Sequence, residues 1–245
     1  MENNILLDAK GLTKTFGTRT AVDRLDLRIE QGDIYGFLGT NGSGKTTTIR
    51  MLTGLIHPDA GEVRIGGYRL RSHFKDAIAL VGAIVEQPAF YAYLSAYDNL
   101  MLAANLLKDV TRTRVLEVLE LVGLTDRAKD KVGSYSLGMR QRLGIAGSLL
   151  NEPKLIILDE PTNGLDPQGM KEIRVMIGQL AAEQGITFLI SSHLLHEVEQ
   201  MCNKIGIIRC GKLVAEGDVQ QLLASGGSRT LEQYFLNITE GEGRL

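Results

Sequence analysis

The chain has 245 residues, a formal net charge of −2 and a hydrophobic content of 44%. This length and balance suit one large or two small globular domains with a sizeable core. The near-neutral charge gives no sign of non-specific nucleic-acid binding, which depends on an excess of lysine and arginine. Its two cysteines are too few for a disulfide scaffold. The first ten residues do not follow a signal-peptide pattern, and no apolar run approaches the ~18 residues that cross a bilayer, so we expect any work at a membrane to require a partner.

Short apolar runs alternate with helical patterns along the chain, which predicts an α/β fold with a mainly parallel sheet. The first thirty residues are rich in short strand patterns, and we expect an additional antiparallel sheet there. A buried strand is expected at 32–39, before a glycine-rich turn. The next segment has helical spacing, with Ile49, Leu52 and Leu55 on one side. Further strands are expected within 59–70 and 79–87.

Residues from about 89 to 150 are predicted to form an inserted helical subdomain between two strands of the sheet. Helical patterns lie within 97–122 and at 137–150. Beyond the insert the alternation resumes, with predicted strands at 154–161, 186–193, 205–209 and 212–216 and predicted helices at 168–185 and 194–201. We therefore expect one domain over 1–220, which includes the helical subdomain, and a polar C-terminal tail over 221–245.

A phosphate-binding loop is predicted where the first buried strand ends. The segment GTNGSGKT, residues 39–46, fits G-x-x-x-x-G-K-[ST] at every fixed position, after a strand and before a helix. The backbone N–H groups of such a loop converge on phosphate oxygens, and the helix N-terminus adds a partial positive charge. Lys45 would neutralise the outer phosphates, and the Thr46 hydroxyl would bind Mg²⁺. The expected nucleotide-binding residues of this segment are Gly39, Thr40, Asn41, Gly42, Ser43, Gly44, Lys45, Thr46 and Thr47.

Two carboxylates follow the strongest apolar strand of the chain, in the segment LIILDEP at 155–161. Asp159 would lie at the carboxyl end of a parallel strand, where ligands bind in such sheets. We expect Asp159 to hold Mg²⁺ through water, since Mg²⁺ keeps several of its waters. Glu160 is the candidate general base that orients the attacking water.

The segment YSLGMRQRL, residues 135–143, resembles the signature of ABC transporters, Leu-Ser-Gly-Gly-Gln followed by Arg-Gln-Arg. Ser136 and Gly138 match the serine and the second glycine of that signature. Tyr135, Leu137 and Met139 depart from it, and the amide of the usual glutamine is lost at Met139. The Ser136 hydroxyl and the N–H groups of the helix start, which would face a γ-phosphate, are kept.

Other segments resemble the same family in the order that the family has them. NGLDP at 163–167 resembles the D-loop, with Asp166 at its acid. His193 resembles the switch histidine that contacts the γ-phosphate. Phe16 resembles the aromatic residue that stacks on adenine. The resemblance extends from about residue 5 to residue 220.

This resemblance implies a P-loop NTPase fold of the ABC type, with a mainly parallel core sheet, an N-terminal antiparallel β subdomain and an inserted α-helical subdomain. It also implies ATP and Mg²⁺ as ligands and ATP hydrolysis as the reaction. In this family two such domains dimerise head to tail, so that ATP bound by Lys45 of one subunit is covered by Ser136 of the other. The dimer docks on a membrane-spanning permease at the cytoplasmic face of the cell membrane, and no nucleic acid is involved. The variant signature and the segment LEQYFLNIT at 231–239 resemble the group that exports, or gives immunity to, bacitracin and lantibiotics.

Three other functions are alternatives to that of a transporter subunit. A soluble ABC-type ATPase acting on DNA or ribosomes usually carries a coiled-coil insertion or two tandem ATPase domains, and neither pattern is present in the sequence. A P-loop kinase for a small molecule would leave the segments 135–143 and 163–167 unexplained. A regulatory binding module with a weak ATPase would differ from a transporter subunit in lacking stimulation by a permease.

The neighbours Glu86 and Gln87 compete for one role. In the ABC family, the strand before the helical subdomain ends in a glutamine that reaches Mg²⁺ and the attacking water. Counting from Glu86, the following apolar-aromatic pair, Ser95 and the helix start YDNL fall in the family's register. We therefore predict that Glu86 is a Mg²⁺ ligand and catalytic residue, with Gln87 as the alternative. A carboxylate is a hard oxygen ligand for Mg²⁺, and lantibiotic-immunity members resemble this chain in carrying glutamate there.

Overall fold

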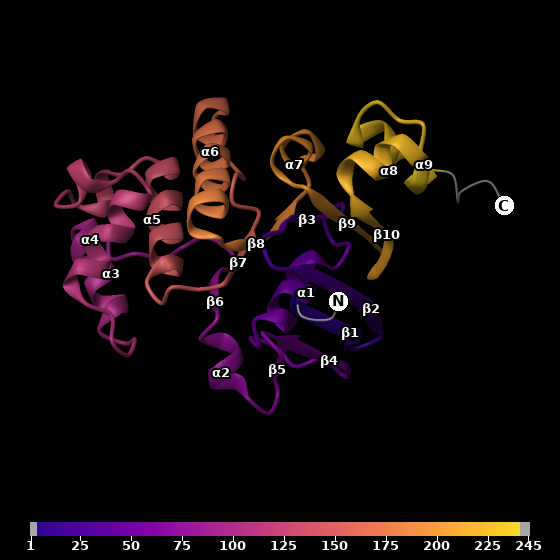
Figure 1. The fold of residues 1–245 in the computed structure, drawn as a ribbon, viewed down its shortest axis with the longest axis horizontal. Coiled ribbons are helices and arrows are strands. Elements are labelled where there is room, and N and C mark those ends of the chain that lie inside the picture. Colours follow the sequence, from indigo (N-terminus) through magenta and orange to yellow (C-terminus); the bar gives the residue numbers. More distant parts are fainter. Residues whose placement is uncertain (1–3, 241–245) are drawn as a thin grey trace.

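A six-stranded sheet forms the centre of the fold in the computed structural model, which describes residues 4–240 (Figure 1). The strand order is β10–β9–β3–β8–β7–β6, in which β10 is antiparallel to β9 and the other neighbours are parallel. Every residue of β7 and β8 is buried, because both faces of this parallel sheet are covered. The mainly parallel sheet is thus confirmed. Its strands are β3 (Ile34–Leu38), β6 (Val81–Ile84), β7 (Leu155–Asp159), β8 (Thr187–Ser192), β9 (Lys204–Arg209) and β10 (Lys212–Asp218).

A second sheet is antiparallel and has the order β2–β1–β4–β5, which confirms the expected N-terminal β subdomain. Its strands are β1 (Ile5–Phe16), β2 (Arg19–Glu30), β4 (Ala60–Ile65) and β5 (Tyr68–Arg69). Helix α1 (Lys45–Leu52) packs between the two sheets, with Ile49, Met51 and Leu52 in their shared core. The prediction that Leu55 shares this buried side is wrong, because α1 ends at Leu52 and Leu55 is 63% exposed.

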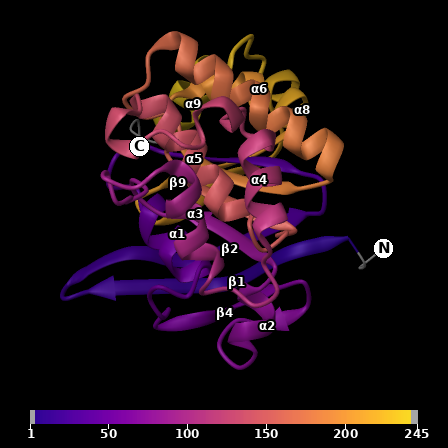
Figure 2. The same ribbon diagram turned by 90° about the vertical axis from the view of Figure 1, so that its left-hand side faces the viewer.

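The predicted helical insert is present between β6 and β7. It consists of α3 (Ala96–Ala104), α4 (Arg112–Leu121) and α5 (Leu137–Leu149), with short 3₁₀ turns at Thr125–Arg127 and Val132–Ser134. Side chains such as Leu100, Val115 and Leu143 form its core, which continues onto the face of the parallel sheet. Figure 1 shows these helices at the opposite end of the molecule from β10, and Figure 2 shows them in front. The helical subdomain therefore lies at the end of the molecule away from the β10 edge of the sheet.

The remaining helices are α2 (Phe74–Ile78), α6 (Pro167–Gln184), α7 (Leu195–Met201), α8 (Val219–Ser225) and α9 (Leu231–Glu240). Helix α2 has no counterpart among the predicted elements, because its five residues are too few to show a helical period. The predicted domain boundary at 220 falls inside α8, and Leu223 and Leu231 pack with Leu38 and Val198. Within residues 4–240, none of the helices has the length and hydropathy required to span a bilayer.

The loop after β6 lies directly against α5, and Gly144 allows this contact. A Cβ atom at Gly144 would lie 2.9 Å from Cγ of Pro88 and 3.1 Å from Cδ1 of Ile84. The side chains of a close-packed interior leave no room for an added methyl group at such distances. The missing side chain at Gly144 therefore helps to position the segment that contains Glu86 and Gln87.

We expect Gly144→Ala to lower the free energy of unfolding by about 1–3 kcal/mol, because overpacking outweighs the better helix propensity of alanine. Gly178→Ala in α6 is a matched control, since a Cβ there meets nothing within 4 Å. The control should raise stability by about 0.5–1 kcal/mol. Urea denaturation of the two variants measures both changes, and a stabilised Gly144→Ala protein would contradict the packing argument.

Candidate functional site

The loop from Gly39 to Gly44 joins β3 to α1 and has the backbone of a phosphate cradle. Gly42 and Gly44 have φ angles of 76° and 114°, a region that favours glycine. A Cβ at Gly44 would lie 2.6 Å from the Ala21 carbonyl oxygen, so a side chain would push the loop off its support. The Ser43 hydroxyl is buried and has no hydrogen-bond partner within residues 4–240. These features fit a loop whose polar groups are completed by a bound anion.

Lys45 places a positive charge inside this loop. Its side chain is only 5% exposed, and Nζ donates to the carbonyl oxygen of Gly39 at 2.7 Å. The same ammonium group lies 3.5 Å from Oε1 of Glu160. The lysine that the motif predicts is therefore directed at the loop, close to Glu160, the catalytic candidate that directly follows β7.

The carboxyl ends of β7 and β8 bring the predicted acids and the predicted histidine together. Asp159 and Ser191 are register partners, and the Ser191 hydroxyl donates to the Asp159 carboxylate. The Glu160 N–H donates to Oγ of Ser191 at 3.0 Å, which fixes the backbone of the acid. His193 Nδ1 lies 3.0 Å from Oε2 of Glu160. The Glu160 carboxylate is thus held between Lys45 and His193.

Two cavities adjoin this cluster and share Thr46 and Glu160. One, of about 350 Å³, is lined by Phe16, Arg19, Ala21, Asn41, Gly42, Gly44, Lys45, Thr46, Thr47 and Glu160. The other, of about 370 Å³, is lined by Thr46, Glu86, Gln87, Pro88, Leu137, Arg140, Gln141, Asp159, Glu160 and Asn163. Phe16, the predicted adenine platform, thus lines one cavity, and the predicted metal ligands Asp159 and Glu86 line the other.

Several lining residues escaped sequence reasoning, namely Arg19, Arg140, Gln141 and Asn163. Arg140 and Gln141 lie within the signature segment at 135–143, but the resemblance assigns nucleotide contacts only to Ser136 and Gly138 of that segment. Arg19 belongs to no motif, and only the register of the β1–β2 hairpin brings it to the cavity. The signal that could have found it is the two-residue turn after Phe16.

Phe16 is exposed in the way that a stacking platform requires. Its side chain is 53% exposed at the rim of the smaller cavity. Lys14 Nζ lies over the ring at 5.6 Å from its centroid, an arrangement that a cation–π attraction favours. The lysine covers part of the ring, and the platform role of Phe16 stays a prediction.

Glu86 and Gln87 line the same cavity, so the geometry leaves both residues as candidates. The carboxylate of Glu86 forms an ion pair with Arg50 of α1, and its side chain is 63% exposed. Glu86 has a φ angle of 72°, which is uncommon for a residue with a side chain. The assignment of Glu86 as a metal ligand stays a prediction. To bind Mg²⁺, its carboxylate would have to leave its ion pair with Arg50.

Ser136, Gly138 and Asp166 lie outside both cavities. The Ser136 side chain caps α5 by accepting a hydrogen bond from the Met139 N–H at 3.2 Å. Asp166 caps α6 in the same way, through the Gly169 N–H at 2.9 Å. Both capping residues are exposed to solvent. A single copy of the chain therefore does not bring these three predicted residues to its own phosphate loop.

The oxygen donors of the site suit Mg²⁺ held jointly by protein and substrate. Thr46 and Asp159 line one cavity, and no group of three or more His, Cys, Asp or Glu side chains within residues 4–240 could hold a metal by itself. Mg²⁺ is bound in such sites by one or two protein oxygens together with phosphates and waters. The residues present therefore fit a magnesium–nucleotide complex better than a metal cage built by the protein alone.

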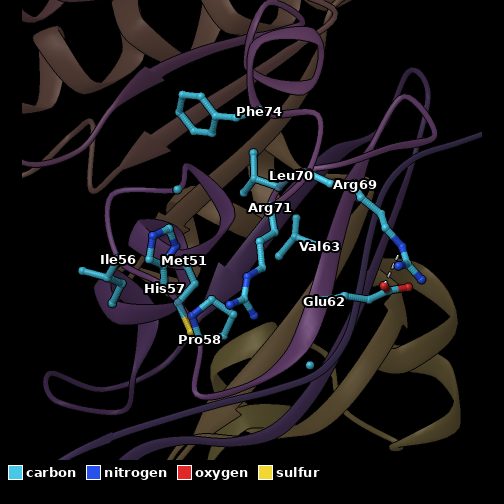
Figure 3. Close-up of a pocket in the computed structure, with 13 residues that line it drawn as sticks. Met51, Ile56, His57, Pro58, Glu62, Val63, Arg69, Leu70, Arg71 and Phe74 are labelled. Carbon is cyan, nitrogen blue, oxygen red and sulfur yellow. Dashed lines mark ion pairs between the residues drawn. The ribbon is translucent and has the colours of Figure 1, made fainter.

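A separate cavity of about 520 Å³ lies at the C-terminal end of α1 (Figure 3). Its wall is mainly apolar and includes Met51, Leu70 and Phe74, and an ion pair between Glu62 and Arg69 lies at one side. No residue of the phosphate loop lines it. This cavity is therefore distinct from the predicted nucleotide site.

Comparisons with known proteins agree with this geometry. A family model described as "ABC transporter" matches residues 22–163. The bacitracin transport ATP-binding protein BcrA of Bacillus licheniformis is 51% identical over 211 residues, which cover 86% of this chain and 69% of BcrA. The lantibiotic transport ATP-binding protein SrtF of Streptococcus pyogenes is 41% identical over 232 residues, 95% of this chain and 96% of SrtF.

Two solved structures show the same fold. A chain described as "Structure of ATP binding subunit of ABC transporter" matches with a TM-score of 0.83 and 29% identity, over 96% of this chain and 99% of that chain. The ATP-binding cassette MJ0796, described as dimeric and bound to ADP and Pi after hydrolysis, matches with a TM-score of 0.77 and 26% identity over 87% of this chain and 99% of that chain. Because the family model also covers more than half of the sequence, the chain belongs to the ABC transporter family, as an ATP-binding and ATP-hydrolysing subunit.

Proposed function

We propose that this chain energises the export of a peptide antibiotic of the bacitracin or lantibiotic kind through a separate membrane permease. Similarity to BcrA and SrtF, two proteins named for bacitracin and lantibiotic transport, carries this proposal. The similarity to SrtF extends over nearly the full length of both chains. As a permease-bound subunit, the chain would work at the cytoplasmic face of the cell membrane.

The catalytic roles follow from the contacts around Glu160. Glu160 would accept the proton of the attacking water as general base, because its carboxylate stands at the strand end beside the phosphate loop. His193 would orient that carboxylate, and Lys45 would bind the outer phosphates of ATP. Thr46 and Asp159 would hold Mg²⁺. When bound, the metal ion neutralises charge that develops on the phosphate oxygens.

The position of the signature helix supports a head-to-tail dimer. Ser136 is exposed and does not line the cavities of its own chain. It would instead cover the nucleotide that Lys45 of a second subunit binds. ATP would then hold the two subunits together, and hydrolysis would loosen them. The dimer would thus have a closed and a loosened state, and this change would be transmitted to the permease.

Inverted membrane vesicles that hold the permease and this chain test the proposed function. We expect ATP-dependent uptake of bacitracin or a lantibiotic by vesicles with the natural chain.

Glu160→Gln should slow release of free phosphate by roughly 10²–10⁴-fold, because a general base is lost, while ATP stays bound and the dimer is trapped. Glu183→Gln on the exposed face of α6 is the matched control. Uptake that is independent of ATP, or normal hydrolysis by Glu160→Gln, would contradict the proposal.

Ser136→Arg tests the role of the signature serine. We expect hydrolysis to be lost while the isolated monomer binds ATP with unchanged affinity, because the arginine would block only the nucleotide of the partner. Ser225→Arg, at the exposed end of α8, controls for an added surface charge. Phosphate release and equilibrium binding of ATP measure the two properties separately. Full turnover by Ser136→Arg would exclude the head-to-tail arrangement.

Glu86→Ala and Gln87→Ala decide which neighbour serves the metal site. We expect only Glu86→Ala to lower permease-stimulated ATP hydrolysis and to raise the Mg²⁺ concentration needed for half-maximal rate, because a hard oxygen ligand is removed. Gln87→Ala is the control from the same loop. If Gln87→Ala alone lowers the stimulated rate, the register that favours Glu86 is wrong.

A further inference from the structure

We propose that Arg19 is a nucleotide-binding residue that contacts a phosphate group of ATP or ADP from the tip of the β1–β2 hairpin. The proposal rests on ATP occupying the cavity between Phe16 and Lys45. Phe16 and Arg19 are register partners across the hairpin, and the turn between them has two residues, with Gly17 at a φ angle of 58°. A short turn with fixed register places both side chains at the same end of the hairpin.

The guanidinium group of Arg19 already contacts the phosphate loop. Its Nη2 atom donates to the carbonyl oxygen of Gly42 at 3.1 Å, across 23 residues of sequence. This bond uses one of the five N–H donors of the group. Arg19 also lines the cavity that Lys45, Thr46 and Thr47 line. Its remaining donors are therefore available beside the loop that binds phosphate.

No acid neutralises Arg19 within residues 4–240, where its one hydrogen bond is to the Gly42 carbonyl. Lys14, the other cation near Phe16, is different, because its Nζ is 2.8 Å from Asp59 and lies over the Phe16 ring. Lys14 thus supports the ring and has its charge balanced. Arg19 is the cation at this rim whose charge is left for a ligand.

The chemistry of arginine fits a phosphate better than a base or a sugar. A guanidinium group donates two parallel hydrogen bonds to phosphate oxygens, and such charge-assisted bonds are about twice as strong as neutral ones. A lysine at the same place would act as a point charge without this geometry. The hairpin would thus hold ATP or ADP at two points, the base on Phe16 and a phosphate on Arg19.

Binding of ADP and of adenosine to the metal-free protein separates these contacts. We expect Arg19→Ala to weaken ADP binding about ten-fold in titration calorimetry, because a charge-assisted bond is lost. Adenosine, followed by NMR titration, should change less than two-fold. Arg19→Lys should fall between the natural chain and Arg19→Ala. Arg28→Ala, on the same strand but paired with Asp8, is the matched control and should bind both ligands normally.

Three results would overturn the proposal. Unchanged ADP affinity in Arg19→Ala would show that the residue makes no phosphate contact. Equal losses for ADP and adenosine would show that Arg19 only supports Phe16. Loss of the thermal unfolding transition in both Arg19→Ala and Arg19→Lys would assign the residue to the fold. Lys45→Ala tests the nucleotide site itself: if it too leaves ADP binding unchanged, the placement of ATP is wrong, whereas a loss in Lys45→Ala alone rejects only the role of Arg19.

Discussion

The contacts of the Glu160 carboxylate with Lys45 and His193 hold the predicted catalytic site together. Three segments that are far apart in sequence meet there because β3, β8 and β7 are neighbours in one parallel sheet. Their carboxyl ends lie at one edge, as the pairing of Asp159 with Ser191 shows. A shift of one strand by one residue would turn its side chains to the other face and break the cluster.

The helical insert depends on the same edge. It leaves the sheet after β6 and returns through α5 to β7, so its loops approach the phosphate site from the side. Gly144 lets the loop after β6 pack closely on α5, and Arg50 of α1 holds the Glu86 side chain. The segment with Glu86 therefore contacts both the phosphate-loop helix and the insert, and it lines one cavity with Thr46 and Asp159, the predicted metal ligands.

Sequence reasoning predicted those parts of the fold that rest on long, strong patterns. The buried runs of β3, β7 and β8 and the phosphate motif lie where they were expected, because an apolar strand and a glycine-rich loop are determined locally. The prediction for Leu55 is wrong because the spacing of apolar residues does not show that α1 ends at Leu52. The contact of Arg19 with Gly42 depends on hairpin register and tertiary packing, neither of which a local pattern contains. Ser136 and Asp166 line neither cavity of their own chain, and their predicted contacts with the nucleotide rest on the family resemblance.

We propose that one complete catalytic site is built from the phosphate loop of one subunit and the signature helix of another. Mixing Lys45→Ala with Ser136→Arg, each of which we expect to be inactive alone, tests this arrangement. A mixed dimer would carry both changes in one site and leave the other site intact, so we expect ATP hydrolysis to reappear on mixing. If the mixture stays inactive while both variants are folded and form mixed dimers, Ser136 does not act on the nucleotide of its partner, and the site is not shared between subunits.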